Sequence, residues 1–123
     1  MTLAFRTIVN DVPAAVAFYT THLGFAEVQV FDAMAILERD GVKLWLAGPK
    51  ASASRPMPDG RRPEPGGWNR LAVIVDDIAA KAAALRAAGV PFRNDVITGP
   101  GGAQVLIEDP SGNPVELFEP RRG

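Results

Sequence analysis

The first half of the chain alternates between strand-like and helix-like patterns of hydrophobic residues. Residues 3–9 separate into two faces with a period of two, which is typical of a β-strand. Residues 12–23 instead repeat apolar side chains at helical spacing, with Asp11 before them as an N-cap and Gly24 after them as a C-terminal signal. Further strands are predicted at residues 26–31, 33–39 and 42–47, the last two joined by a hairpin turn at Asp40 and Gly41. The predicted order is therefore β-α-β-β-β.

The second half repeats this order. Its predicted elements are a strand at 69–75, an alanine-rich helix at 78–88 closed by Gly89, and strands at 92–98, 103–107 and 115–118. Asp11 corresponds to Asp77, 66 residues later, and residues 41–49 correspond to residues 112–120, 71 residues later. Two modules that each have one apolar face to bury are expected to pair around a cleft.

The two modules are separated by a stretch rich in proline and glycine. Residues 49–67 contain five prolines and three glycines, a composition typical of a surface linker. A lid, or an arm that lies on a partner subunit, is the alternative. We expect a single domain over residues 1–123, with a first module at 1–48, a linker at 49–67 and a second module at 68–120.

Composition and charge exclude several classes of function. The chain has 13 basic and 14 acidic residues and a net charge of −1, so neither nucleic acid nor a membrane surface is an expected partner. It has no cysteine, which excludes thiol catalysis, disulfides and thiolate metal sites and fits a cytoplasmic location. No signal peptide is evident, and no apolar run approaches the ~20 residues of a membrane-spanning helix.

Glu116 is the first residue that we expect to carry chemistry. It follows a turn of composition DPSGN at residues 109–113 and lies in a short strand. Alternation places Val115 and Leu117 on one face of this strand and Glu116 and Phe118 on the other. If Val115 and Leu117 pack on the core, a carboxylate and an aromatic ring share the opposite face.

Three segments together carry a resemblance to a known family. They are FRTIVNDVPAAVAFYTTHLGF at 5–25, RLAVIVDDIAAKAAALRAAGV at 70–90 and EDPSGNPVELFEP at 108–120. The chain resembles the vicinal-oxygen-chelate superfamily, which includes glyoxalase I, bleomycin-resistance proteins, fosfomycin-resistance proteins and extradiol dioxygenases. The resemblance implies an α+β fold in which two paired βαβββ modules form a cupped mixed sheet with the helices outside. It also implies a homodimer. It is specific for the fold and not for the reaction.

The resemblance also assigns the positions of metal ligands. Metal-using members place them on the first and last strand of each module, which correspond here to Ala4, Trp45, Arg70 and Glu116. An alanine methyl cannot coordinate, an indole offers only a donor N–H, and a guanidinium repels cations. The chain therefore resembles the metal-free members. We expect no metal and no other cofactor, and neither glyoxalase nor dioxygenase activity.

We predict a metal-independent protein that binds and sequesters a planar or anionic small molecule. Trp45 and Phe118 would stack on this ligand, and Arg6 and Arg70 would attract its anionic groups. Glu116 would bind a cationic or hydroxyl group. Two alternatives stay open. In one, the protein is a lyase or isomerase with Glu116 as general base and Arg70 holding the substrate anion. In the other, Arg70 and Glu116 merely neutralise each other.

The remaining polar candidates are predicted to have structural roles. Asp11, Asp76 and Asp77 are expected to cap helices. His22 is expected at the surface near the end of the first helix, where a cation is favourable, and Tyr19 in the core.

Overall fold

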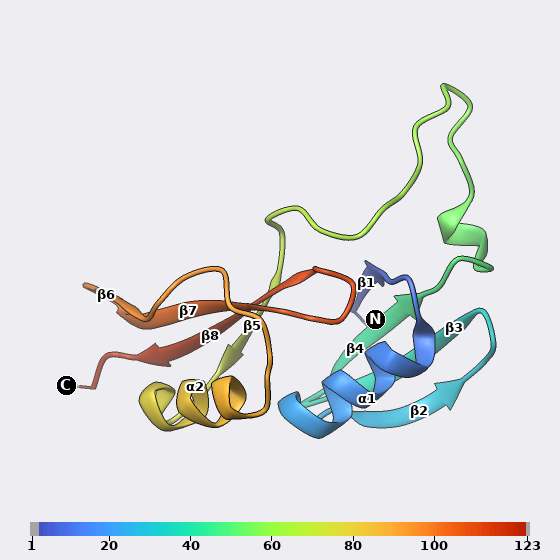
Figure 1. The fold of residues 1–123 in the computed structure, drawn as a ribbon. Helices are drawn as coiled ribbons and strands as arrows, with labels where there is room; N and C mark the ends of the chain where they lie inside the picture. The colour runs from blue at the N-terminus through green and yellow to red at the C-terminus, as the bar shows by residue number, and fades with distance from the viewer. Residues whose placement is uncertain (1–2, 123) are drawn as a thin grey trace. The chain divides into compact units, whose positions relative to one another are not determined.

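The protein contains two compact units with the same order of elements. The structure, a computed structural model, describes residues 3–122. Unit 1 comprises residues 1–66 and unit 2 comprises residues 67–123. Each unit has a four-stranded mixed sheet with one helix (Figure 1). The predicted α+β fold, with β-α-β-β-β in each half, is confirmed.

Unit 1 follows the predicted boundaries closely. Its elements are β1 (Ala4–Ile8), α1 (Val12–Leu23), β2 (Ala26–Val30), β3 (Met34–Arg39), β4 (Val42–Ala47) and the short helix η1 (Ser52–Ser54). The strand order is β1-β4-β3-β2, with β1 parallel to β4 and the other pairs antiparallel. The predicted hairpin turn is confirmed, because both Asp40 and Gly41 adopt positive φ angles, of 52° and 79°.

The core of unit 1 lies between α1 and the sheet. The helix begins where the Asp11 carboxylate accepts a hydrogen bond from the Ala14 N–H at 3.0 Å, and it ends at Gly24, whose φ is 71°. Tyr19 is 1% exposed and meets the ring of Phe25 edge-on at 5.8 Å, so its predicted core position is confirmed. This packing buries one face of the sheet.

Unit 2 repeats the same topology. Its elements are β5 (Leu71–Ile74), α2 (Ile78–Ala87), β6 (Ile97–Gly99), β7 (Gly102–Glu108) and β8 (Pro114–Pro120). The strand order is β5-β8-β7-β6, and β5 runs parallel to β8. In unit 1 Arg6 pairs with Trp45, and in unit 2 Ala72 pairs with Glu116. These are equivalent positions of the two repeats, so the internal repeat extends to the register of the strands.

The predicted strand at residues 92–98 is wrong. Only Phe92 forms an isolated bridge, to Ile107, and regular pairing begins at β6. The reason is the polar Asn94, whose side-chain oxygen accepts the Leu106 N–H at 2.9 Å and so takes the place of a backbone carbonyl in the ladder. The segment leaves the sheet after this point and returns at Ile97.

The turn before β8 is held by one buried carboxylate. Asp109 is 2% exposed and accepts hydrogen bonds from the backbone N–H groups of Ser111 and Asn113, at 2.8 and 2.9 Å. The side-chain amide of Asn113 donates to its other oxygen at 3.0 Å. This local network sets the residue at which β8 begins and therefore which of its side chains face the core.

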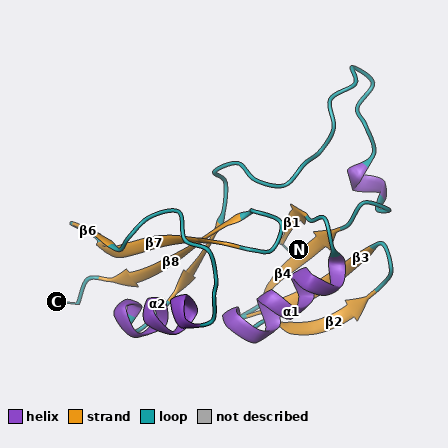
Figure 2. Cartoon of the chain, viewed as in Figure 1, coloured by secondary structure: helices purple, strands orange, loops and turns teal. Residues whose placement is uncertain are grey.

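Residues 49–67 form an extended connection with one short helical turn, η1 (Figure 2). Near its start, Lys50 forms an exposed ion pair with Asp32 at 2.8 Å. The hydrogen bond from Lys50 lowers the pKa of Asp32 and, reciprocally, raises the pKa of Lys50. Such an exposed pair stabilises the fold little. None of the helices within residues 3–122 has both the length and the apolar character needed to cross a membrane.

Candidate functional site

Each helix covers one face of its sheet, and we call the opposite face the open face. In unit 2, α2 packs on β7 and β8 (Figure 1). Val115 and Leu117 of β8 are at most 1% exposed, as a strand that faces a helix requires. Glu116 and Phe118 alternate with them and are only partly buried. The open face therefore carries the carboxylate and the aromatic ring, as the alternation predicts.

Arg70 and Glu116 form an ion pair on the open face of unit 2. Nε and Nη2 of Arg70 both donate to Oε1 of Glu116, at 3.0 and 2.8 Å. The two side chains are 29% and 13% exposed. The sequence predicted that Arg70 lies within a strand, but it lies just before β5. Its Nη1 donates to the carbonyl oxygen of Trp68 at 3.1 Å. The pair is thus partly shielded from water and attached to the segment that enters β5.

A second ion pair lies on the same face. Arg93 Nε donates to Glu108 Oε2 at 2.8 Å. Leu106 pairs with Glu116 across β7 and β8, and Glu108 is two residues further along β7, so period-two alternation places it on the open face. Glu108 directly precedes the turn at Asp109 but binds Arg93.

Arg93 also reaches the start of unit 2. Its Nη1 donates to the Gly67 carbonyl oxygen at 2.7 Å, and its Nη2 donates to the Gly112 carbonyl oxygen at 3.0 Å. Its guanidinium lies 4.7 Å from the centre of the Trp68 ring. Sequence analysis missed both Arg93 and Trp68. The available signal was a tryptophan two residues before Arg70, directly after the linker at residues 49–67.

In unit 1, Arg6 and Trp45 lie together on the open face. They are register partners in β1 and β4, and the Arg6 guanidinium lies 4.9 Å from the centre of the indole ring. Trp45 Nε1 is buried and has no hydrogen-bond partner among residues 3–122. An unpaired buried donor is costly unless an acceptor reaches it. The side chains of Arg6 and Trp45, predicted to contact a ligand, are thus in contact with each other.

The residues at the metal-ligand positions do not suit a divalent cation. Ala4 and Trp45 offer no donor atom for a metal, and Glu116 is held by the cationic Arg70. Across residues 3–122, no group of three or more histidine, cysteine, aspartate or glutamate side chains is arranged to hold a metal ion. This donor set provides one carboxylate where zinc and the harder cations need several ligands.

Other polar side chains near the sheets have structural roles. The Asp77 carboxylate accepts the Ala80 N–H at 3.0 Å, and Glu119 Oε1 accepts the Ile78 N–H at 2.8 Å, so α2 has two caps. His22 lies in the last turn of α1 with its ring 5.5 Å from that of Phe18. Its predicted place at the helix end is confirmed.

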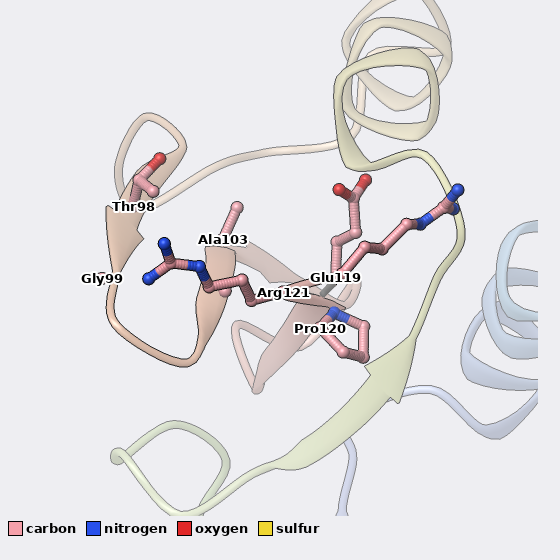
Figure 3. A pocket seen from close by; sticks show the side chains of 8 residues that line it. Thr98, Gly99, Ala103, Glu119, Pro120 and Arg121 are labelled. Carbon is pink, nitrogen blue, oxygen red and sulfur yellow. The ribbon is translucent and has the colours of Figure 1, made fainter.

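A hollow of about 560 Å³ lies elsewhere in unit 2, beside the start of α2 (Figure 3). In this view Arg121 extends toward Thr98 and Gly99, and Glu119 points toward the helix. The lining residues are Thr98, Gly99, Gly102, Ala103, Glu119, Pro120, Arg121 and Arg122. None of the predicted ligand-binding residues lines this hollow.

Comparison with known proteins assigns the chain to a family. The family model described as Glyoxalase/Bleomycin resistance protein/Dioxygenase superfamily matches residues 3–117. No curated protein matches the sequence significantly.

Several solved structures share the fold. A member of the same superfamily from Sphaerobacter thermophilus is 28% identical, with a TM-score of 0.75, and the alignment covers 97% of this chain and 96% of that chain. A lactoylglutathione lyase from Agrobacterium tumefaciens is 24% identical, with a TM-score of 0.75 and coverage of 97% and 92%. An antibiotic-binding protein from a Streptomyces species is 24% identical, with a TM-score of 0.73 and coverage of 98% and 96%.

The Arg70–Glu116 pair is expected to contribute measurably to stability. A double-mutant cycle with Arg70→Met and Glu116→Gln, read by urea unfolding, should give a coupling free energy of about 1 kcal/mol, because the pair is hydrogen-bonded and partly shielded from water. The matched control is the exposed pair Arg86–Asp95, whose cycle with Arg86→Met and Asp95→Asn should give a value close to zero. Equal coupling in the two cycles would contradict the geometry described for Arg70.

Proposed function

We propose that this chain, which belongs to the Glyoxalase/Bleomycin resistance protein/Dioxygenase superfamily, is a metal-independent small-molecule-binding protein. It would sequester a planar or anionic compound. The observation that carries the proposal is the Arg70–Glu116 ion pair on the open face of unit 2. Arg70 is bound to Glu116, the one carboxylate at the positions where metal-using members of the family place their ligands. In the proposal, the side chains of this face therefore bind the ligand directly and not through a metal.

The open faces have the chemistry of small-molecule sites. Each brings an aromatic ring and a guanidinium to the same face, Trp45 with Arg6 in unit 1 and Phe118 with Arg70 in unit 2. Exposed apolar surface with a few fixed polar groups is the usual composition of such sites. In the proposal Trp45 and Phe118 stack on the ligand, Arg6 and Arg70 attract its anionic groups, and Glu116 accepts a hydrogen bond from it.

Arg6 and Arg70 differ in how many of their N–H groups are available to attract an anion. Three of the five N–H groups of Arg70 already donate to Glu116 and to Trp68. Arg6 is exposed and lies over the ring of Trp45, and within residues 3–122 its side chain forms no described hydrogen bond or ion pair. Arg6 is therefore the stronger candidate for attracting an anion. Arg70 would mainly orient Glu116.

The proposal includes a homodimer and a cytoplasmic location. Support for association comes from β2, an edge strand whose five residues are all exposed. Val28, Val30 and the following Phe31 are each about half exposed, at 52%, 48% and 49%. An uncovered apolar edge strand favours pairing with another chain.

Ligand binding should depend on Arg6. Isothermal titration calorimetry with planar aromatic carboxylates and glycopeptide antibiotics is expected to find a ligand, and Arg6→Met should weaken the binding of an anionic ligand about five-fold, the size of an exposed cation–π or charge contact. The matched control is Arg55→Met, because Arg55 is an exposed arginine of the same unit with no described side-chain contact. Equal affinities of the two variants would exclude Arg6 from the site.

The alternative activity is a lyase or isomerase reaction with Glu116 as general base. Both donors of Arg70 bind Oε1 of Glu116, so a base reaction would have to use Oε2. Glu116→Gln separates the two functions, since glutamine keeps a hydrogen-bonding oxygen but cannot act as a base. A binding protein should keep its ligand affinity within a few-fold in this variant. Turnover that falls by more than roughly 100-fold with unchanged affinity would instead establish the enzyme.

Metal should be unnecessary for ligand binding. Elemental analysis of the tag-free protein should find no stoichiometric metal, and titration with Zn²⁺, Mn²⁺ or Ni²⁺ should give no one-to-one binding, because a single carboxylate next to a guanidinium is a poor ligand set. Chelator treatment should leave the ligand affinity unchanged. One equivalent of metal that is lost in Glu116→Ala would overturn the assignment of Ala4, Trp45 and Arg70 as non-ligands.

A further inference from the structure

Trp68 is the most exposed aromatic residue of unit 2 and is nevertheless held in place. Its exposure is 69%. An exposed side chain of this size is ordinarily free to change rotamer. Here the guanidinium of Arg93 lies 4.7 Å from the centre of its ring, and that guanidinium is itself fixed by Glu108 and by two backbone carbonyls.

The backbone of the same segment is also restrained. Arg93 Nη1 donates to the Gly67 carbonyl oxygen at 2.7 Å, and Arg70 Nη1 donates to the Trp68 carbonyl oxygen at 3.1 Å. Two arginines, each bound to a carboxylate of the open face, thus hold two consecutive carbonyls. Arg93 lies against one side of the indole ring, and Arg70 holds the backbone of Trp68. Most of the surface of the side chain stays in contact with solvent.

We infer that Trp68 is a ligand-stacking residue of unit 2 and that Arg93 is the residue that positions its ring. This inference rests on the proposed function and names a further contact for its ligand. An aromatic ring that is already immobilised loses little conformational entropy when a second ring stacks on it. Because Arg93 covers one side of the indole, the ligand stacks on the exposed side.

The charges around Trp68 define the class of ligand. Arg93 lies over the ring and Arg70 binds the carbonyl oxygen of Trp68. Each arginine is paired with one carboxylate, so these two pairs are neutral overall but present guanidinium N–H groups. Three N–H groups of Arg70 donate to protein acceptors, which leaves two for a ligand oxygen. The ligand is therefore a planar aromatic compound with a carbonyl or carboxylate oxygen that can accept hydrogen bonds from these two N–H groups, which an aromatic ammonium compound cannot do.

A purely structural role of Trp68 does not account for the exposure of its ring. If Trp68 only anchored the start of unit 2, its ring would be expected to bury apolar area against the sheet. The two carbonyl hydrogen bonds already anchor this segment without the ring. An exposed indole contributes little further stability by burial.

The experiment observes the two tryptophans separately. The chain has only Trp45 and Trp68, so a ¹⁵N–¹H spectrum shows two indole N–H resonances that Trp45→Phe and Trp68→Phe assign. The full-length protein is titrated with 2-naphthoate, with naphthalene-2-methylammonium as the charge-reversed probe and cyclohexanecarboxylate as the non-aromatic probe. We expect 2-naphthoate to shift the Trp68 resonance and to bind most tightly of the three.

Variants test the stacking and the positioning roles. Trp68→Ala should weaken 2-naphthoate binding roughly 10-fold and Trp68→Phe much less, whereas Met57→Ala, which removes another exposed apolar side chain, should have no effect. Arg93→Met should change the Trp68 resonance and reduce the preference for the carboxylate probe over the ammonium probe. Arg93→Lys, which keeps the charge, should restore part of that preference.

The results separate this inference from the function beneath it. Binding of 2-naphthoate with an unchanged Trp68 resonance and an unchanged affinity in Trp68→Ala would overturn the role of Trp68 and leave the proposed function standing. Tighter binding of the ammonium probe would overturn the assignment of the ligand as a hydrogen-bond acceptor, and an unchanged Trp68 resonance in Arg93→Met would overturn the role of Arg93. If none of the compounds tested here or in the calorimetric screen bound at millimolar concentration, the proposed function would fail, and the inference would fail with it.

Discussion

A four-stranded sheet has two faces, and within residues 3–122 each unit of this protein provides one α-helix to cover them. The face against the helix takes the apolar side chains, because burial there removes them from water. Within the described part of the chain, the other face has no α-helix of its own unit packed on it, and its side chains can be polar, aromatic or charged. The arrangement of β8 follows from this constraint. Val115 and Leu117 lie against α2, and Glu116 and Phe118 are left on the open face.

The charges on the open face of unit 2 are largely satisfied within the protein. Arg70 binds Glu116, Arg93 binds Glu108, and both arginines also hold backbone carbonyls at the start of the unit. A face on which each cation has its own carboxylate offers little net attraction for an ion. In the proposed function, selectivity for a ligand then depends more on fixed aromatic rings and on the direction of the remaining N–H groups than on charge.

Most regular elements could be predicted because their signals are local. The hairpin at Asp40 and Gly41, the caps at Asp11 and Asp77 and the turn at Asp109 each depend on residues close together in sequence. The strand predicted at 92–98 failed because Asn94 replaces a backbone acceptor with its side chain, which no pattern of apolar residues reveals.

The sequence by itself determined the order of the elements, the internal repeat and the face on which Glu116 lies, because hydrophobic period and turn chemistry are properties of neighbouring residues. The internal repeat and the family resemblance also brought Arg70 and Glu116 together, as the structure confirms, but only the tertiary structure showed that Arg93 meets Glu108. Arg93 and Glu108 are 15 residues apart, and Arg70 and Glu116 are 46 apart, so their contacts depend on how β5, β7 and β8 assemble. The position of Trp68 depends on both pairs, so the local sequence can single out a tryptophan after the linker but not the contacts that hold its ring.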